Sequence, residues 1–232
     1  MFEQFTEYFW IALFAALVFY GLWQTVSAPF LVKRFYRNIA FEDQGKSLLD
    51  RPPYQPSVLL KNLNAAHLYK GSYEEYRLEQ FAAFPETRHK FTLSRVQRKR
   101  NQAMWTITLL HGERELLPFS ARPTNVTEAV EYVLKGGNVD FPDDEGFSKR
   151  VHVMADNQTA VRELLAPAVR DYLKNIDPVS IETVGSVLVH KSPRQPHDTG
   201  NKLRSDLDAV VGIYKELAPH QSTNTDAVTA QT

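Results

Sequence analysis

Few residues in this sequence have the type and spacing that chemistry requires. The densest group consists of carboxylates, at Asp140, Asp143, Asp144 and Glu145. Carboxylate oxygens suit a hard cation such as Mg²⁺ or Ca²⁺, but the group lacks the alternating ligands and the closing glutamate of an EF-hand loop. We therefore interpret it as a solvated loop. The chain has no cysteine, which excludes disulfides, thiolate metal sites and cysteine nucleophiles.

Sequence motifs of known catalytic sites are absent. There is no glycine-rich phosphate loop, no G-x-S-x-G elbow and no H-E-x-x-H motif. The nearest approach, His111-Gly112-Glu113, lies in a predicted turn, and the other histidines stand singly; we expect His152 and His190 to be satisfied or exposed. We predict no catalytic residue, no metal and no cofactor. An enzyme whose site is assembled from distant residues remains an alternative, because such sites are defined by geometry rather than by sequence order.

The local excess of charge is basic. Arg98, Lys99 and Arg100 lie between two strand-like segments, where a hairpin tip would expose them. They could contact an anionic lipid surface, or they could form an ordinary solvated turn. Nucleic-acid binding is unlikely, because the chain balances 27 basic residues against 27 acidic residues.

The N-terminus is the most unusual part of the sequence. From Tyr8 to Val32 no residue is charged, and a helix needs about 20 apolar residues to cross the hydrocarbon of a membrane. The pattern predicts a transmembrane helix within residues 1–32; a buried core helix and a cleaved signal peptide are the alternatives. The residues that we expect to face lipid are Phe9, Trp10, Leu13, Leu17, Phe19, Leu22 and Trp23.

Basic residues follow the apolar run closely but do not precede it. Lys33, Arg34 and Arg37 come directly after it, whereas the first seven residues contain Glu3 and Glu7. Because basic flanks stay in the cytoplasm, this asymmetry predicts a single-pass protein with its N-terminus outside and its C-terminal domain cytoplasmic. The expected partners are the lipid bilayer, other membrane proteins and, less strongly, anionic lipid.

The remainder of the chain divides into three parts. Residues 33–57 are predicted to be a proline-rich connector, residues 58–217 a folded domain and residues 218–232 a disordered tail. Within the domain, residues 58–84 are ambiguous and favour strands. Residues 89–97, 103–110 and 116–120 predict an antiparallel meander, since Trp105, Ile107 and Leu109 alternate with polar residues.

The C-terminal half alternates strands and helices. Residues 127–135 predict a short helix, 149–155 a strand, and 156–175 an amphipathic helix that Asp156 or Asn157 can cap and that Pro167 kinks. Residues 180–190 predict a strand in which Gly185 forms a bulge, and residues 201–217 a second amphipathic helix. The predicted class is α+β: an N-terminal transmembrane helix, an antiparallel meander, and a strand-helix-strand-helix C-terminal half.

The order of several short motifs in the second half resembles that of a known group of proteins. These motifs are Phe119-Ser120-Ala121-Arg122-Pro123, Val139-Asp140-Phe141, Gly146-Phe147-Ser148, Ala155-Asp156 and Ile181-Glu182-Thr183-Val184-Gly185. The group comprises uncharacterised bacterial membrane-anchored proteins with a cytoplasmic α+β domain, and the similarity covers roughly residues 90–217 and the apolar N-terminus. The resemblance implies a place in the bacterial inner membrane, and it carries no activity and no catalytic residue.

The function expected from the sequence is that of an accessory protein that interacts with other proteins. An anchor, one domain and the absence of catalytic motifs favour it. The alternatives are a membrane-tethered enzyme with a non-local site, and a sensor of anionic lipid or nucleic acid that uses residues 98–100.

Overall fold

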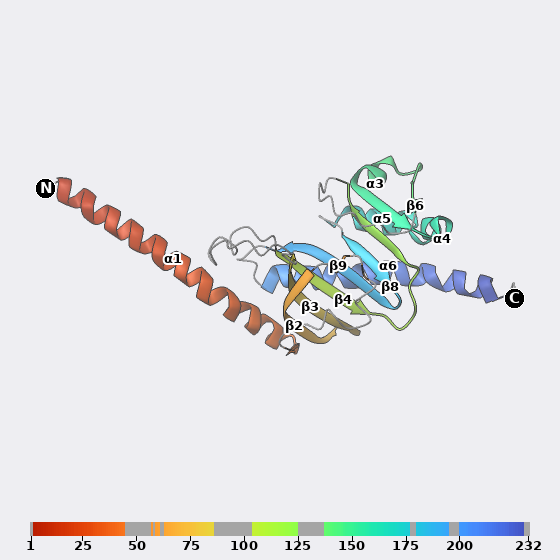
Figure 1. Ribbon diagram of the computed structural model, residues 1–232, viewed down its shortest axis with the longest axis horizontal. Coiled ribbons are helices and arrows are strands. Elements are labelled where there is room, and N and C mark those ends of the chain that lie inside the picture. Colours follow the sequence, from red (N-terminus) through yellow and green to blue (C-terminus); the bar gives the residue numbers. More distant parts are fainter. Residues whose placement is uncertain are drawn as a thin grey trace, which may run out of the picture.

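The computed structural model describes residues 2–44, 57, 59–60, 63–85, 104–124, 137–176, 180–194 and 200–229. Their strands form one antiparallel sheet, in the order β1-β2-β3-β4-β9-β8-β5-β7-β6 (Figure 1). The strands are β1 (Glu42–Asp43), β2 (Leu63–Tyr73), β3 (Tyr76–Pro85), β4 (Met104–His111), β5 (Phe119–Pro123), β6 (Gly137–Asn138), β7 (Val151–Ala155), β8 (Ile181–Val184) and β9 (Val187–Arg194).

Helices of very different length accompany the sheet. They are α1 (Phe2–Asn38), α3 (Glu145–Arg150), α4 (Gln158–Leu164), α5 (Pro167–Lys174) and α6 (Gly200–Thr229). Helix α6 packs along β4 and β9, and α4 and α5 pack against α6. Figure 1 shows α1 projecting from the rest of the molecule, with only its C-terminal end close to the sheet.

The two faces of the sheet have separate apolar cores. On the α6 face, Leu78, Leu110 and Leu188 lie in one row across β3, β4 and β9, in the same core cluster as the apolar residues of α6. The opposite face carries Phe81, Ile107 and other buried residues of β3, β4 and β9, with Leu59 and Leu60 packed on them. Period-two alternation along β4 separates the two cores, because successive side chains of a strand point to opposite faces.

Residues 58–84 favoured strands, and most of that segment forms β2 and β3. These strands pair antiparallel, and their connection lies at Tyr73–Tyr76. Glu74 has φ 53°, the left-handed conformation that tight turns use. The predicted strand at residues 103–110 corresponds to β4.

The predicted order of strands is wrong. We expected residues 103–110 to pair with residues 116–120, but β4 pairs with β3 and β9, and β5 lies beyond β8. The reason is a hairpin within the segment 180–190: Gly185, at φ +56°, sits in the turn between β8 and β9 rather than in a bulge. This hairpin supplies the strand that neighbours β4.

The segment expected as one kinked helix is two helices. Asn157 caps α4 by accepting a hydrogen bond from the backbone N–H of Ala160, as predicted. Helix α5 begins at Pro167, where proline is favoured because the first turn needs no amide donor. The predicted strand over 149–155 begins only at Val151, since Glu145–Arg150 forms α3, capped by Asp144.

The prediction of an N-terminal transmembrane helix is wrong. Among the residues that the structure describes, no helix has the length and apolar character needed to cross a membrane. A run without charge is not necessarily strongly apolar: this run contains Tyr20, Gln24 and Thr25, and α1 also includes charged residues at both ends. The predictions that depended on the span, a single-pass inner-membrane protein with its N-terminus outside, are corrected with it.

Several sequence predictions fall outside the described residues. They are the strand over 89–97, the basic tip at Arg98, Lys99 and Arg100, the helix over 127–135 and residues 45–56 of the proline-rich connector. The first residues of the predicted connector continue α1 to Asn38. Helix α6 extends to Thr229 and so includes much of the segment for which we expected a disordered tail.

Candidate functional site

Helix α1 exposes apolar side chains along the part that projects from the molecule. We call the segment Phe9–Tyr20 the exposed end of α1. Phe14 is 70% exposed, and its large neighbours are exposed as well: Phe9, Trp10, Ile11, Leu13, Leu17, Val18, Phe19 and Tyr20. These residues occupy all sides of the helix, because consecutive positions differ by about 100° around its axis. The exposed end is therefore an apolar rod rather than one apolar face.

The opposite end of α1 is buried, and we call Val32–Phe41 the base of α1. Tyr36 is 1% exposed and stacks on Tyr69 of β2, with ring centroids 3.7 Å apart and ring planes 11° apart. Val32 and Phe41 complete the apolar contact. The start of α6 lies against the base, since a Cβ added at Gly200 would come 2.8 Å from the ring of Phe35.

A chain of hydrogen bonds joins the base of α1 to the sheet and to α6. The hydroxyl of Tyr36 donates to Oε1 of Gln80 on β3 at 2.7 Å. Nε2 of Gln80 then donates to the hydroxyl of Thr108 on β4 at 2.8 Å and to the carbonyl of Leu203 on α6 at 3.4 Å. The buried amide of Gln80 is thereby satisfied, and it connects α1, β4 and α6.

Gln80 belongs to a group of buried polar residues between the sheet and α6, which we call the polar band. In register across the strands, Gln80 is opposite Thr108 and Thr108 is opposite His190; in the next row, Thr106 is opposite Ser192. All five residues are buried. Neither ring nitrogen of His190 has a hydrogen-bond partner among the described residues, and the same holds for the hydroxyls of Thr106 and Ser192.

Burial lowers the pKa of His190 to about 4, and the positive charge of Lys202 adds to the effect. The ammonium of Lys202 lies 2.8 Å from a carboxylate oxygen of Asp206, which is itself only 2% exposed. His190 is therefore neutral at pH 7, and the charge that acts on it from α6 is that of Lys202, which pairs with Asp206.

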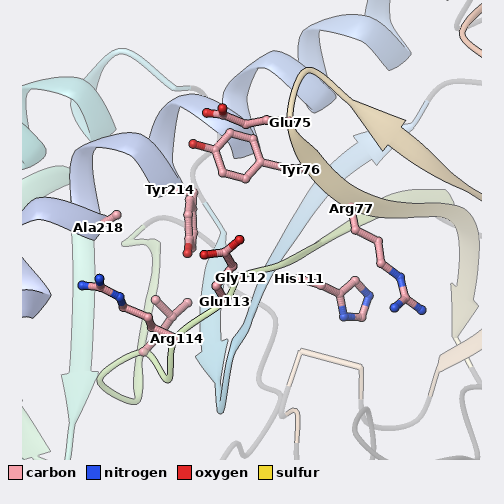
Figure 2. A pocket seen from close by; sticks show the side chains of 10 residues that line it. Glu75, Tyr76, Arg77, His111, Gly112, Glu113, Arg114, Tyr214 and Ala218 are labelled. Carbon is pink, nitrogen blue, oxygen red and sulfur yellow. The ribbon is translucent and has the colours of Figure 1, made fainter.

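A pocket of about 510 Å³ opens where the β2–β3 turn, the end of β4 and α6 meet (Figure 2). Arg77 and His111 are opposite each other in the β3–β4 register, and Arg114 approaches from the loop after β4. The remaining lining residues are Glu75, Tyr76, Gly112, Glu113, Leu116, Tyr214 and Ala218. Only glycine fits at position 112, because a Cβ there would come 2.6 Å from the hydroxyl of Tyr214.

The polar contacts around this pocket hold the β2–β3 turn on α6. Tyr73 donates a hydrogen bond to Asp208 at 2.6 Å, which raises the pKa of that tyrosine, and Lys215 pairs with Glu74 at 2.6 Å. The lining itself has two arginines and two glutamates, all exposed, so it has no net preference for an anion or a cation. The expected mark of an enzyme was a deep pocket with convergent His, Asp and Arg; here the charged side chains lie at an open surface.

The acidic cluster is largely exposed, as expected of a solvated loop, but two of its carboxylates are also ion-paired. The guanidinium of Arg170 lies 2.6 Å from a carboxylate oxygen of Asp143, and Lys174 lies 3.1 Å from Asp144. The hydrogen bond from Arg170 lowers the pKa of Asp143 and raises that of Arg170. For Asp144, burial alone would raise the pKa, but the N–H of Phe147 and the ammonium of Lys174 outweigh it and lower the value.

This ion-pair network joins α5 to the loop before α3, and Arg170 also covers the ring of Phe141 at 4.9 Å. Its carboxylates already have cationic partners, which supports a structural role. Within the described residues, no group of three or more His, Asp or Glu side chains is placed to hold a metal ion.

The residues predicted to contact membrane lie as follows. Phe9, Trp10, Leu13, Leu17 and Phe19 are exposed on α1, while the side chains of Leu22 and Trp23 are outside the described set. Among the basic residues after the run, Arg34 and Arg37 are exposed, and Lys33 pairs with Asp43 at 3.5 Å.

Sequence reasoning missed the polar band entirely. His190 was expected to be satisfied or exposed, and Thr106 and Thr108 were recognised only as the polar side of an alternating strand. The alternation along β4 was the available signal, since it places Thr106 and Thr108 on one face of the strand. The amphipathic helix predicted over 201–217 had to cover one face of the sheet, and that face could be the one with the threonines. The pairing of β4 with β9, which brings the histidine beside the threonines, could not be derived from it.

In the part of the chain that the structure describes, nine strands form one antiparallel sheet, a long helix covers one of its faces, and a projecting apolar helix stands on a buried base. No protein-family model matches the sequence, and no curated protein matches it. Among solved structures, the crystal structure of the mycobacterial trehalose monomycolate transport factor A, TtfA, is similar, with a TM-score of 0.56 and 13% sequence identity over 83% of this chain and 97% of that chain. At 13% identity this likeness establishes a shared fold and nothing more. The resemblance to bacterial membrane-anchored proteins that the motif order indicated is therefore supported only as regards the fold.

Proposed function

We propose that this protein is a non-catalytic accessory protein that binds a partner protein through the exposed end of α1. The observation that carries the proposal is the continuous apolar surface of Phe9–Tyr20. Contiguous apolar patches of this kind mark interaction surfaces, because leaving them in water is unfavourable. An apolar helix that inserts into a groove of another protein is a recurrent form of recognition.

The chemistry of the exposed end defines the partner surface that would fit it. Phe9–Tyr20 contains no charged residue, so the partner groove must be uncharged and apolar. The segment is about 18 Å long at 1.5 Å per residue. Because its apolar side chains point to all sides, a one-sided groove would leave part of them in water, and we expect several partner helices to surround it.

The base of α1 supports the same proposal. Stacking of Tyr36 on Tyr69 and its hydrogen bond to Gln80 fix the C-terminal end of the helix on the sheet. The exposed end is thereby held in one direction before any partner binds. Preorganisation of this kind lowers the entropy cost of association.

The fold comparison is compatible with an accessory role. TtfA is described as a transport factor, and the likeness covers most of both chains. A factor that assists a transport process acts on other proteins or their cargo, and this supports binding of a partner rather than catalysis by the chain itself. The identity of the transported compound is a property of TtfA and is not extended to this chain.

Parallel affinity purification of three tagged full-length chains tests the proposal. The chains are the unmodified protein, Leu17→Asp at the exposed end, and the matched control Glu163→Ala, which changes an exposed residue of α4. We expect one protein to be enriched with the unmodified chain and the control and to be lost with Leu17→Asp. The enriched protein, purified separately, should bind Leu17→Asp at least tenfold more weakly, since an aspartate in an apolar groove is strongly desolvated.

Other occupants of the exposed end give distinct results. If lipid vesicles bind the chain and Leu17→Asp abolishes that binding while no protein partner depends on Leu17, the proposal is overturned. If the only partner that depends on Leu17 is a second copy of this chain, which size measurements would reveal as a dimer, an accessory role toward another protein is also excluded.

A further inference from the structure

The interface between α6 and the sheet changes character along its length. Toward the middle of α6, where Tyr214 lies against Gly112 at the end of β4, the sheet presents the apolar row Leu78, Leu110 and Leu188. Toward the start of α6, where Lys202 and Leu203 lie, it presents the polar band. Two stretches of one helix are therefore held by different chemistry.

The polar band is incompletely satisfied. His190 is 2% exposed, and neither of its ring nitrogens has a hydrogen-bond partner among the described residues; the hydroxyls of Thr106 and Ser192 are in the same condition. Buried polar atoms without partners oppose packing, since they give up hydrogen bonds to water. Opening of this stretch of the interface would let water reach all of them at once.

From this geometry we propose that the polar band is an acid-sensitive switch: uptake of a proton by His190 separates the first half of α6 from the sheet and loosens the base of α1. An imidazolium in this position would be a desolvated cation. Among the described groups, the charge that acts on it is that of Lys202, which adds repulsion and is itself paired with Asp206. The facing side chains of β4 and β8, Thr108 and Ile181, bring no charge, and α1 reaches the band only through the hydroxyl of Tyr36.

The opening is transmitted to α1 by contacts already described. Gln80 donates a hydrogen bond to the carbonyl of Leu203 and accepts one from Tyr36. Displacement of the start of α6 therefore breaks this series of hydrogen bonds at Leu203. Gly200 lies against Phe35 at the same place. The exposed end of α1 would then lose its fixed direction, whatever it binds.

The pH range follows from the two states of the imidazole. In the open state His190 has its ordinary pKa near 6.5, and in the closed state its pKa is about 4. The ratio of open to closed molecules should therefore rise as pH falls, by up to tenfold per pH unit between these values and by about 300-fold in total. Above pH 6.5 it should not change.

Thiol labelling measures this opening directly, because the natural chain has no cysteine. Ser192→Cys places one buried thiol in the polar band at little steric cost. Ser120→Cys is a matched control: Ser120 is equally buried, but it lies on β5 opposite Glu182, on the face of the sheet away from α6. The rate of reaction with a disulfide reagent that remains active at low pH is measured from pH 7 to pH 4 and divided by the rate of an unstructured cysteine peptide.

We expect the normalised rate at Ser192→Cys to rise by about 100-fold between pH 7 and pH 4, while the rate at Ser120→Cys changes much less. Adding His190→Gln, which cannot be protonated, should abolish the rise. A third chain, Val32→Cys, should follow Ser192→Cys if the base of α1 loosens with the band. A flat profile at Ser192→Cys, an equal rise at Ser120→Cys, or a rise that persists in His190→Gln would overturn the switch, and a flat profile at Val32→Cys would overturn its connection to α1.

A further measurement needs no variant at His190, should that variant fail to fold. The proposal requires one imidazole that titrates below pH 5 in the folded chain, and proton NMR follows all seven histidines. If every histidine titrates near pH 6.5, the proposal is wrong.

Discussion

The two ends of α1 both carry aromatic and aliphatic side chains, but these side chains have opposite environments. Tyr20 is 60% exposed on the projecting end, whereas Tyr36 is 1% exposed, stacked on Tyr69 and hydrogen-bonded to Gln80. Both ends are rich in aromatic and aliphatic residues. The difference lies in burial: the base packs on β2, β3 and α6, whereas the large apolar side chains of the exposed end remain open to solvent.

This comparison separates two roles of apolar surface in one helix. At the base, burial stabilises the fold and orients the helix. At the exposed end, the same kind of side chain contributes little to the stability of the isolated chain and remains available for binding. Substitutions at matched positions should therefore affect stability at one end and binding at the other.

The largest effect is expected from Tyr36→Ala. It removes a buried aromatic ring, its stacking and its hydrogen bond, and should lower the free energy of unfolding by about 3–5 kcal/mol. Tyr20→Ala at the exposed end is the matched control, for which we expect a change within about 0.5 kcal/mol. Urea unfolding of both variants measures the difference, and equal losses would remove the distinction between the two ends.

The polar band should make stability at the base depend on pH. The pKa of His190 is lowered in the folded state, so its contribution is fully present above pH 6.5 and is lost as pH falls toward 4. The loss should reach about 3 kcal/mol, since one pKa unit corresponds to about 1.4 kcal/mol. The difference in unfolding free energy between the natural chain and His190→Gln, measured from pH 7 to pH 4, reports this contribution. A difference that does not vary with pH would argue against a neutral buried imidazole.

Removing one oxygen atom should have a smaller effect. Tyr36→Phe keeps the stacked ring but leaves Oε1 of Gln80 without the hydroxyl that donates to it. We expect a loss of about 1–2 kcal/mol, because a buried acceptor then lacks its partner. Unfolding of Tyr36→Phe beside Tyr36→Ala divides the stability of the base into its polar and apolar parts. A loss as large as that of Tyr36→Ala would mean that the ring itself contributes nothing.

The smallest effect on stability should come from the exposed end itself. Phe14 is 70% exposed, and Phe14→Ser should change the free energy of unfolding by no more than about 0.5 kcal/mol. The same variant should weaken partner binding clearly, because an apolar anchor is lost. A large loss of stability would indicate that Phe14 packs within the folded chain.

Sequence reasoning predicted local elements where chemistry is local. The alternation of Trp105, Ile107 and Leu109 indicated β4, the cap at Asn157 indicated the start of α4, and Pro167 marked the break before α5. Each of these features depends on neighbouring residues, and capping and period-two alternation are visible in a single sequence.

What the sequence did not reveal depends on contacts between distant residues. The hairpin at Gly185 brings β9 beside β4, and only this pairing places His190 beside Thr108. The cations that neutralise Asp143 and Asp144 lie on α5, 27 and 30 residues away in sequence. The transmembrane helix predicted from the uncharged N-terminal run was wrong for a related reason. The absence of charge alone does not determine what surrounds a helix.

Photo-cross-linking along α1 tests most directly that its exposed end binds a partner protein. A benzophenone amino acid is introduced at Phe14 or Leu17 of the exposed end and, for comparison, at Arg37, which is exposed beside the buried base. We predict that Phe14 and Leu17 form adducts with one and the same protein and that Arg37 forms none. Adducts with lipid alone at Phe14 and Leu17, or protein adducts of equal yield at Arg37, would contradict the account.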